Sequence, residues 1–282
     1  MSTYYSELSV PHRYNGYIQK FWTLDNLAHA FYTPVKYALP NGYCTLVFID
    51  GKGVCLKIDD KPIELPAGIY IAGQMTKRIG ISLSPHTRAV MAQVKPWLPA
   101  LITNFPMKDL VNNVISLAYL NTKLYRKLLN VNQAEQKIVA AELCQKLESY
   151  LQQNADSSLI QWAFNRLENS QAQQHRIADL ALPSGYTQRR IEQKFKALVG
   201  PTAKEIQRIL QFRKVMEEFD QFQSRGYLSV LAHRHGYYDQ SHFIRSYQRI
   251  MGETPSLFDH NGYILPISGH FDFIQSSPFT DL

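Results

Sequence analysis

The feature that most constrains this chain is an internal repeat near its C-terminal end. Residues 180–202 (LALPSGYTQRRIEQKFKALVGPT) and 231–254 (LAHRHGYYDQSHFIRSYQRIMGET) share a Leu-Ala pair and, four residues later, a Gly-Tyr pair, both at an offset of 51 residues. A glycine after a short apolar segment permits a sharp turn, because glycine adopts positive φ without steric cost. Thr187 and Asp239 stand where a helix N-cap is needed. Each copy therefore predicts a short helix, a tight turn and a second helix.

The second helix of each copy is amphipathic. Its apolar face carries Ile191, Phe195 and Leu198 in the first copy, and Phe243, Tyr247 and Ile250 in the second. The opposite faces hold Arg189, Glu192, Gln193 and Lys196, and Gln240, Ser241, Ile244, Arg245 and Gln248. A short polar helix anchored on one side suits the major groove of DNA. An ordinary bundle of helical hairpins is the alternative, and the presence of two matched copies favours DNA binding.

Both segments resemble the AraC/XylS family of transcription regulators, over residues 160–258. The family's two patterns are matched by Leu180-Ala181, Gly185, Thr187, Arg189, Ile191, Gln193 and Phe195, and by Gly236-Tyr237, Asp239, Ser241-His242-Phe243, Arg245, Tyr247, Gly252 and Thr254-Pro255. Gln193 replaces a frequent arginine, and Pro201-Thr202-Ala203 replaces the usual Ser-Pro order.

The resemblance implies a sequence-specific DNA-binding regulator whose two units are joined by one long helix, here roughly 203–223. Its expected buried residues are Ile206, Ile209, Leu210, Met216 and Phe219. A rigid spacer of this kind directs the two recognition helices toward successive major grooves, about 34 Å apart.

Twelve residues are candidate DNA contacts. Arginine pairs with guanine and glutamine with adenine, so the expected base readers are Arg189, Gln193, Gln240 and Arg245. Expected phosphate or backbone contacts are Arg190, Lys196, Ser241 and His242, and Ile244 is expected against a thymine methyl group. Glu192 either accepts from cytosine or is a solvated acid. Gln188 and Gln248 complete the set, while His233 and His235 are expected in solvent or near phosphates.

Residues 1–105 are expected to be β-rich. Short apolar runs at 44–50, 54–59, 69–73, 79–83 and 89–94 alternate with glycine, proline and asparagine, which is typical of a barrel or sandwich. A helical stretch is expected over 107–152, and the polar residues 152–158 form a linker in which Asp156 or Ser157 caps the next helix. The expected fold is α+β with two domains. These are a β-rich sensor or dimerisation domain with trailing helices (1–154) and an AraC-type DNA-binding domain (155–262), followed by a C-terminal tail (263–282).

Charge is consistent with an anionic partner but does not locate its binding site. The net charge is +7, with +5 in residues 1–157, +5 in 158–258 and −3 in the remainder. Hydrophobic residues make up 45% of the 282 residues, which disfavours wholesale disorder. No apolar run approaches the ~20 residues of a membrane span. The first residues lack the basic and apolar segments of a secretory signal, so a cytoplasmic protein is expected.

Catalytic and metal sites are not expected. The cysteines, Cys44, Cys55 and Cys144, form no CxxC pair, and His12, His29 and His86 lack the spacing of metal ligands. The sequence is therefore interpreted as that of a regulator without cofactor, metal or enzymatic activity. The alternative is an enzyme of the DNA-repair methyltransferase type that carries a DNA-binding module. That alternative requires an activated cysteine thiolate.

The N-terminal part more weakly resembles an N-terminal domain found in some AraC-type regulators. Five aromatic residues are candidates for a pocket, although a plain core is the commoner fate: Trp22, Tyr43, Phe48, Tyr70 and Trp97. A stripe on the expected 134–151 helix suggests a dimer interface, with intradomain packing as an equally simple explanation: Ala134, Ile138, Ala141, Leu147 and Leu151. Candidate partners are therefore double-stranded promoter or operator DNA, RNA polymerase, a small-molecule effector and a second copy of the chain. No membrane partner is expected.

Overall fold

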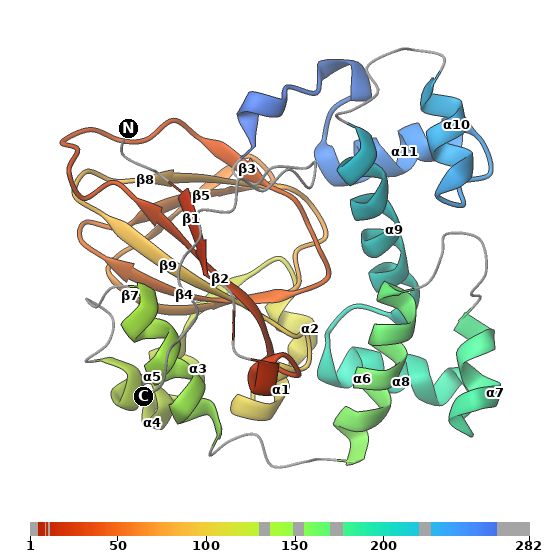
Figure 1. The fold of residues 1–282 in the computed structure, drawn as a ribbon, viewed down its shortest axis with the longest axis horizontal. Coiled ribbons are helices and arrows are strands. Elements are labelled where there is room, and N and C mark those ends of the chain that lie inside the picture. Colours follow the sequence, from red (N-terminus) through yellow and green to blue (C-terminus); the bar gives the residue numbers. More distant parts are fainter. Residues whose placement is uncertain are drawn as a thin grey trace.

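The computed structural model describes residues 5–8, 10, 12–129, 136–148, 155–169, 177–219 and 227–263 (Figure 1). The tail expected over 263–282 falls outside this range apart from its first residue. The same is true of Ala134, Leu151 and the linker residues 152–154.

Two antiparallel sheets make up most of the N-terminal half. One has the order β1 (Tyr5–Leu8), β2 (Ile18–Asp25), β9 (Arg88–Val94), β4 (Cys44–Asp50), β7 (Gly68–Ala72) and β10 (Val114–Ser116). The other has the order β3 (Lys36–Ala38), β8 (Ile79–Leu83), β5 (Val54–Ile58) and β6 (Lys61–Leu65). Buried side chains from both sheets, including Trp22, Ile49, Leu56 and Ile81, form one cluster. In the described residues no strand joins the two sheets, so the arrangement is a sandwich and no closed barrel forms.

The strand predictions are confirmed in part. All five expected strands are present, and five more that the sequence did not indicate are β1, β2, β3, β6 and β10. The helical stretch expected over roughly 107–152 is interrupted by β10, where Val114, Ile115 and Ser116 pair with β7. Conversely, α1 (Leu98–Ile102) interrupts the segment expected to be β-rich. A three-residue strand is too short to show a periodicity of its own, and only its pairing partner stabilises it.

Short helices cover the outer face of the six-stranded sheet: α2 (Met107–Leu110), α3 (Leu117–Leu120), α4 (Thr122–Leu128) and α5 (Gln136–Glu148). On α5 the buried residues are Val139, Ala140, Leu143, Cys144 and Leu147. Of the predicted stripe, Leu147 is buried, whereas Ile138 is 52% exposed and Ala141 is also exposed. The buried face of α5 joins the core beneath β2 and β9, which is the intradomain alternative.

The C-terminal half is helical, and the fold as a whole is α+β. It contains α6 (Ala155–Glu168), the 3-10 turn η3 (Ile177–Leu180), α7 (Ala181–Ser184), α8 (Gln188–Leu198), α9 (Ala203–Phe219), α10 (Tyr227–Arg234) and α11 (Gln240–Met251), then the 3-10 turns η4 (Pro255–Leu257) and η5 (His260–Gly262). The predicted cap at Asp156 or Ser157 is wrong, because α6 already includes both residues and Ser157 is buried. Among the described residues, no helix is both long and apolar enough to cross a membrane.

The two halves share their cores. Trp97 lies in the same buried cluster as Phe164 of α6 and Phe195 of α8, and Leu39 lies in the cluster around α11. In Figure 1 the sheets stand beside α9, with α6–α8 at one end of that helix and α10 and α11 at the other.

Candidate nucleic-acid interface

The first helix-turn-helix unit has the predicted local geometry. Gly185 has a φ of +71°, which turns the chain between α7 and α8. The Thr187 hydroxyl accepts a hydrogen bond from the Arg190 amide (3.2 Å) and caps α8. Ile191 and Phe195 are completely buried, as expected, whereas Leu198 is only partly buried. The opposite face exposes Gln188, Arg189, Arg190, Gln193 and Lys196.

The second unit repeats this geometry. Gly236 has a φ of +78°, and an Asp239 carboxylate oxygen accepts from the His242 amide (2.6 Å) at the start of α11. Phe243 and Tyr247 are fully buried and Ile250 nearly so, which confirms all three anchors. The exposed residues are Ser241, His242, Arg245 and Gln248, while Gln240 is partly exposed. Ile244 is half-buried and packs beside the aromatic cluster, so only part of its side chain is open to a ligand.

Helix α9 belongs to the cores of both units. Ile206 and Leu210 pack in the cluster of the first unit, and Phe212, Val215 and Met216 in that of the second. The predicted buried positions are therefore confirmed, with Phe219 partly buried. A capping box begins the helix: the Thr202 hydroxyl accepts from the Glu205 amide (3.1 Å), and Glu205 accepts from the Thr202 amide (2.8 Å). One continuous helix thus fixes the spacing of the two recognition helices.

Three of the polar residues near the recognition helices have partners inside the protein. A Glu192 carboxylate oxygen accepts from the Ala203 amide (3.0 Å), so this carboxylate caps α9. The His242 ring packs against Tyr237, with ring centroids 5.2 Å apart. His235, expected in solvent or near phosphate, is instead buried, with its Nε2 3.1 Å from a Glu218 oxygen.

Two exposed tyrosines were not predicted from the sequence as DNA contacts. Tyr186 is 46% exposed and Tyr238 is 89% exposed, and each lies in the turn that precedes a recognition helix. The sequence signal that could have indicated them is an aromatic residue one or two positions after the turn glycine of each unit. Side chains of this kind reach phosphate oxygens through their hydroxyl groups.

The N-terminal half contacts the C-terminal end of α11. The Arg78 amide donates to the Ile250 carbonyl oxygen (2.9 Å), and its guanidinium forms an ion pair with Glu253 (2.8 Å). The same guanidinium lies over the ring of Tyr37, 4.4 Å from its centroid. Tyr263 also contacts Tyr37, so several contacts tie β3 and the segment before β8 to the second unit.

A second junction joins the sheets to α6. The Tyr43 hydroxyl donates to Glu168, and the Lys95 ammonium lies 3.7 Å from the same carboxylate. Trp97 and Phe164 meet edge to face, with centroids 5.7 Å apart. Burial is the main cause that raises the pKa of Tyr43, and Glu168 adds to it, so Tyr43 stays protonated.

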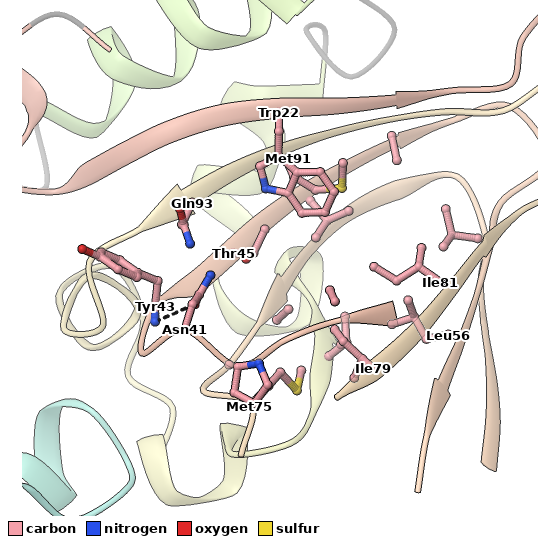
Figure 2. Close-up of a pocket in the computed structure, with 18 of the residues that line it drawn as sticks. Trp22, Asn41, Tyr43, Thr45, Leu56, Met75, Ile79, Ile81, Met91 and Gln93 are labelled. Carbon is pink, nitrogen blue, oxygen red and sulfur yellow. Dashed lines mark hydrogen bonds between the residues drawn. The ribbon is translucent and has the colours of Figure 1, made fainter. Parts of the chain in front are cut away.

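A cavity of about 80 Å³ lies between the two sheets (Figure 2). Trp22 and Tyr43 line it, which agrees with two of the five aromatic candidates. The other three, Phe48, Tyr70 and Trp97, pack in the cores instead. The polar residues at the cavity wall were not foreseen: Lys20, Asn41, Thr45 and Gln93. The signal that could have found them is the alternation of facing within β2, β4 and β9.

Two of the three cysteines, Cys44 and Cys55, do not resemble activated nucleophiles. Cys44 is fully buried, and burial raises the pKa of its thiol to about 12. The pKa of Cys55 is also raised, chiefly by burial and then by Glu64. A reactive cysteine needs its pKa lowered, which is the opposite direction. In the described ranges, no group of three or more histidine, cysteine and acidic side chains is arranged to hold a metal ion.

Two family models match the chain. A helix-turn-helix domain model matches residues 180–261, which contain both units and α9. A domain of unknown function, DUF6597, matches residues 12–116, which contain the two sheets. No curated protein matches the chain.

Solved structures resemble this one at low sequence identity. ToxT from Vibrio cholerae aligns with a TM-score of 0.44 and 9% identity, over 84% of this chain and 95% of that chain. The unsaturated fatty acid bound form of ToxT aligns with a TM-score of 0.42 and 11% identity, over 81% and 94%. The AraC-like transcriptional activator CuxR aligns with a TM-score of 0.28 and 11% identity, over 73% and 85%. Likenesses of this degree carry no functional inference.

Proposed function

We propose that this chain is a DNA-binding transcription regulator of the AraC/XylS type, and that it binds promoter or operator DNA through the exposed faces of α8 and α11. The observation that carries this proposal is the role of α9, whose side chains lie in the cores of both units. A helix shared in this way holds two polar faces at a fixed spacing. Fixed spacing is what a protein needs to read two major-groove segments together.

Four side chains are proposed to read bases: Arg189, Gln193, Gln240 and Arg245. The two arginines and Gln193 are exposed, and each lies on the face opposite the buried anchors. Arg190, Lys196, Ser241, Tyr186 and Tyr238 are proposed to contact the sugar-phosphate backbone, which positions the protein without specifying sequence. Among the original twelve candidates, Glu192 is the one whose carboxylate already has a structural partner.

The arginines give the sharpest test of this assignment. Each of Arg189→Ala and Arg245→Ala is expected to cost about 1–3 kcal/mol of binding free energy and to relax preference at one base position. Lys196→Ala is expected to weaken all sequences alike and to make the log–log salt slope shallower by about one unit. The measurement is selection from randomised DNA by the full chain, followed by binding titrations at several salt concentrations.

Arg126→Ala supplies the matched control, because Arg126 is an exposed arginine on α4, outside both units. It should change neither affinity nor base preference. If Arg189→Ala and Arg245→Ala both lower affinity uniformly and leave every base preference intact, the two arginines bind phosphates. Specificity would then depend on Gln193, Gln240 and DNA shape.

The N-terminal half is proposed to control these units, through a small-molecule effector or through dimerisation. The cavity between the sheets supports the first route, and the Arg78 and Tyr43 junctions supply a path to both units. The sensor or dimerisation domain is proposed to span residues 1–154, the DNA-binding domain 155–262 and the C-terminal tail 263–282. RNA polymerase is proposed as a further partner at the promoter. Dimerisation is tested by sedimentation of the full chain, where a monomer at high micromolar concentration contradicts it.

A further inference from the structure

The strand register places a row of polar side chains at one end of the cavity. Gln93 of β9 is paired with Lys20 of β2 on one side and with Thr45 of β4 on the other. Residues that are directly opposite on paired strands point to the same face of a sheet. All three line the cavity, and Asn41 and Tyr43 lie at the same end, as Figure 2 shows.

The remainder of the cavity is apolar. Two residues along the same strands, the next row consists of Trp22, Met91 and Val47. Beyond it lie Ala89 and Ile49, and the four-stranded sheet faces them with Leu56, Ile79 and Ile81. A molecule in this cavity would therefore meet hydrogen-bonding groups at one end and hydrocarbon along its body.

Gln93 has an unused amide at the polar end. Gln93 is only 7% exposed, and no hydrogen bond joins its side chain to another group in the described parts of the chain. Its amide atoms are not among the fully enclosed polar atoms, so they are accessible from the cavity that Gln93 lines. A ligand that offers both an acceptor and a donor at this point would satisfy that amide.

The cations at this end are already paired. The Lys20 ammonium lies 2.5 Å from a Glu7 carboxylate oxygen, and Tyr5 also donates to that carboxylate. Lys95, which contacts the Tyr43 hydroxyl at 3.4 Å, is paired with Glu168. Each positive charge thus has its own carboxylate, so an anionic ligand would have to compete for it.

We infer that the cavity binds a compact apolar molecule that carries one uncharged, hydrogen-bonding head group, held by Gln93 and Thr45. The volume of about 80 Å³ is several times the ~10–15 Å³ that a single water requires, so the cavity has room for more than water, and its small size favours a compact molecule over a long chain. The inference rests on the proposed function in one respect: the bound molecule acts as an effector only if the N-terminal half controls DNA binding.

Three probes of equal heavy-atom count and similar shape test the head group. They are p-toluamide (uncharged and polar), p-toluate (anionic) and p-cymene (without a polar head), and ligand-observed NMR with the full chain measures their affinities. At pH 7, p-toluamide is expected to bind at least tenfold more tightly than p-toluate. In Gln93→Leu, which keeps the side-chain volume, p-toluamide should weaken about tenfold while p-cymene does not weaken.

Val47→Phe fills the cavity and should abolish binding of both uncharged probes, provided that circular dichroism shows an unchanged fold. Thr45→Val removes only a hydroxyl and should weaken p-toluamide alone. Preferred binding of p-toluate, an equal loss of p-toluamide and p-cymene in Gln93→Leu, or no binding of any probe overturns the inference. DNA binding by the same proteins, measured without probe, reports separately on the proposed function.

Discussion

At the scale of single residues, Glu192 shows why an outward-facing side chain is not always available to a ligand. It lies on the polar face of α8, one residue before Gln193, and the sequence left it open between a cytosine contact and a solvated acid. The structure gives its carboxylate a third role, because it accepts from the Ala203 amide at the start of α9. An acid near a helix N-terminus also interacts favourably with the helix dipole.

Glu192→Ala is therefore expected to lower the free energy of unfolding by about 0.5–2 kcal/mol, the usual effect of removing a capping group. The preferred DNA sequence should not change. Chemical denaturation and selection from randomised DNA measure the two effects. Gln193→Ala is the neighbouring control, with stability changed by no more than ~0.5 kcal/mol and base preference relaxed. Loss of preference at a cytosine in Glu192→Ala, with stability unchanged, would contradict the capping role.

At the scale of elements, the joint between α9 and α10 depends on a buried histidine. His235 contacts Glu218 of α9, and its carbonyl oxygen accepts from the Gln211 side chain (2.7 Å). Burial lowers the pKa of His235 below 6.5, and the raising effect of Glu218 does not fully offset it. Arg234 and Lys214 lower it further. The imidazole is therefore neutral in the folded protein at neutral pH.

This histidine predicts a loss of stability in mild acid. Below pH 6.5 the unfolded chain binds a proton at His235 that the folded chain does not, so the free energy of unfolding falls as the pH falls toward the lowered pKa. Between pH 8 and pH 5.5, the melting temperature should fall further in the wild type than in His235→Gln. The exposed His233 gives the control, and His233→Gln should follow the wild type. An equal dependence of the melting temperature on pH in the wild type and in His235→Gln would contradict the prediction.

At the scale of the whole molecule, the Arg78 contacts join the sheets to the second unit. The Arg78–Glu253 pair is mostly buried, with side-chain exposures of 22% and 21%. The adjacent Lys77–Asp59 pair lies entirely in the N-terminal half and is more exposed, at 44% and 51%. Solvent screens an exposed pair, so the two pairs should differ in strength although they are neighbours in sequence.

A double-mutant cycle measures this difference. Arg78→Ala and Glu253→Ala are expected to show a coupling energy of about 1–2 kcal/mol in the unfolding of the full chain, within the range for contacting, partly buried groups. The cycle with Lys77→Ala and Asp59→Ala should give less than about 1 kcal/mol. Equal coupling in the two cycles would mean that the contact between the halves adds no stability of its own.

The sequence alone determined those features that depend on neighbouring residues. The turn at Gly185, the caps at Thr187 and Asp239 and the buried face with Phe243 follow from φ preferences, short hydrogen bonds and the helical period, so the repeat was sufficient to predict them. The polar faces of α8 and α11 follow from the same period.

Only the tertiary structure decided the features that depend on distant partners. The burial of Val139 rather than Ile138 on α5, the strand at 114–116 and the role of Glu192 each depend on a segment far away or on another element. The polar end of the cavity also depends on distant segments, because strand pairing places Gln93 beside Lys20 and Thr45 of neighbouring strands. Hydrophobic patterning allows several registers and partners of similar energy, and long-range packing selects one of them.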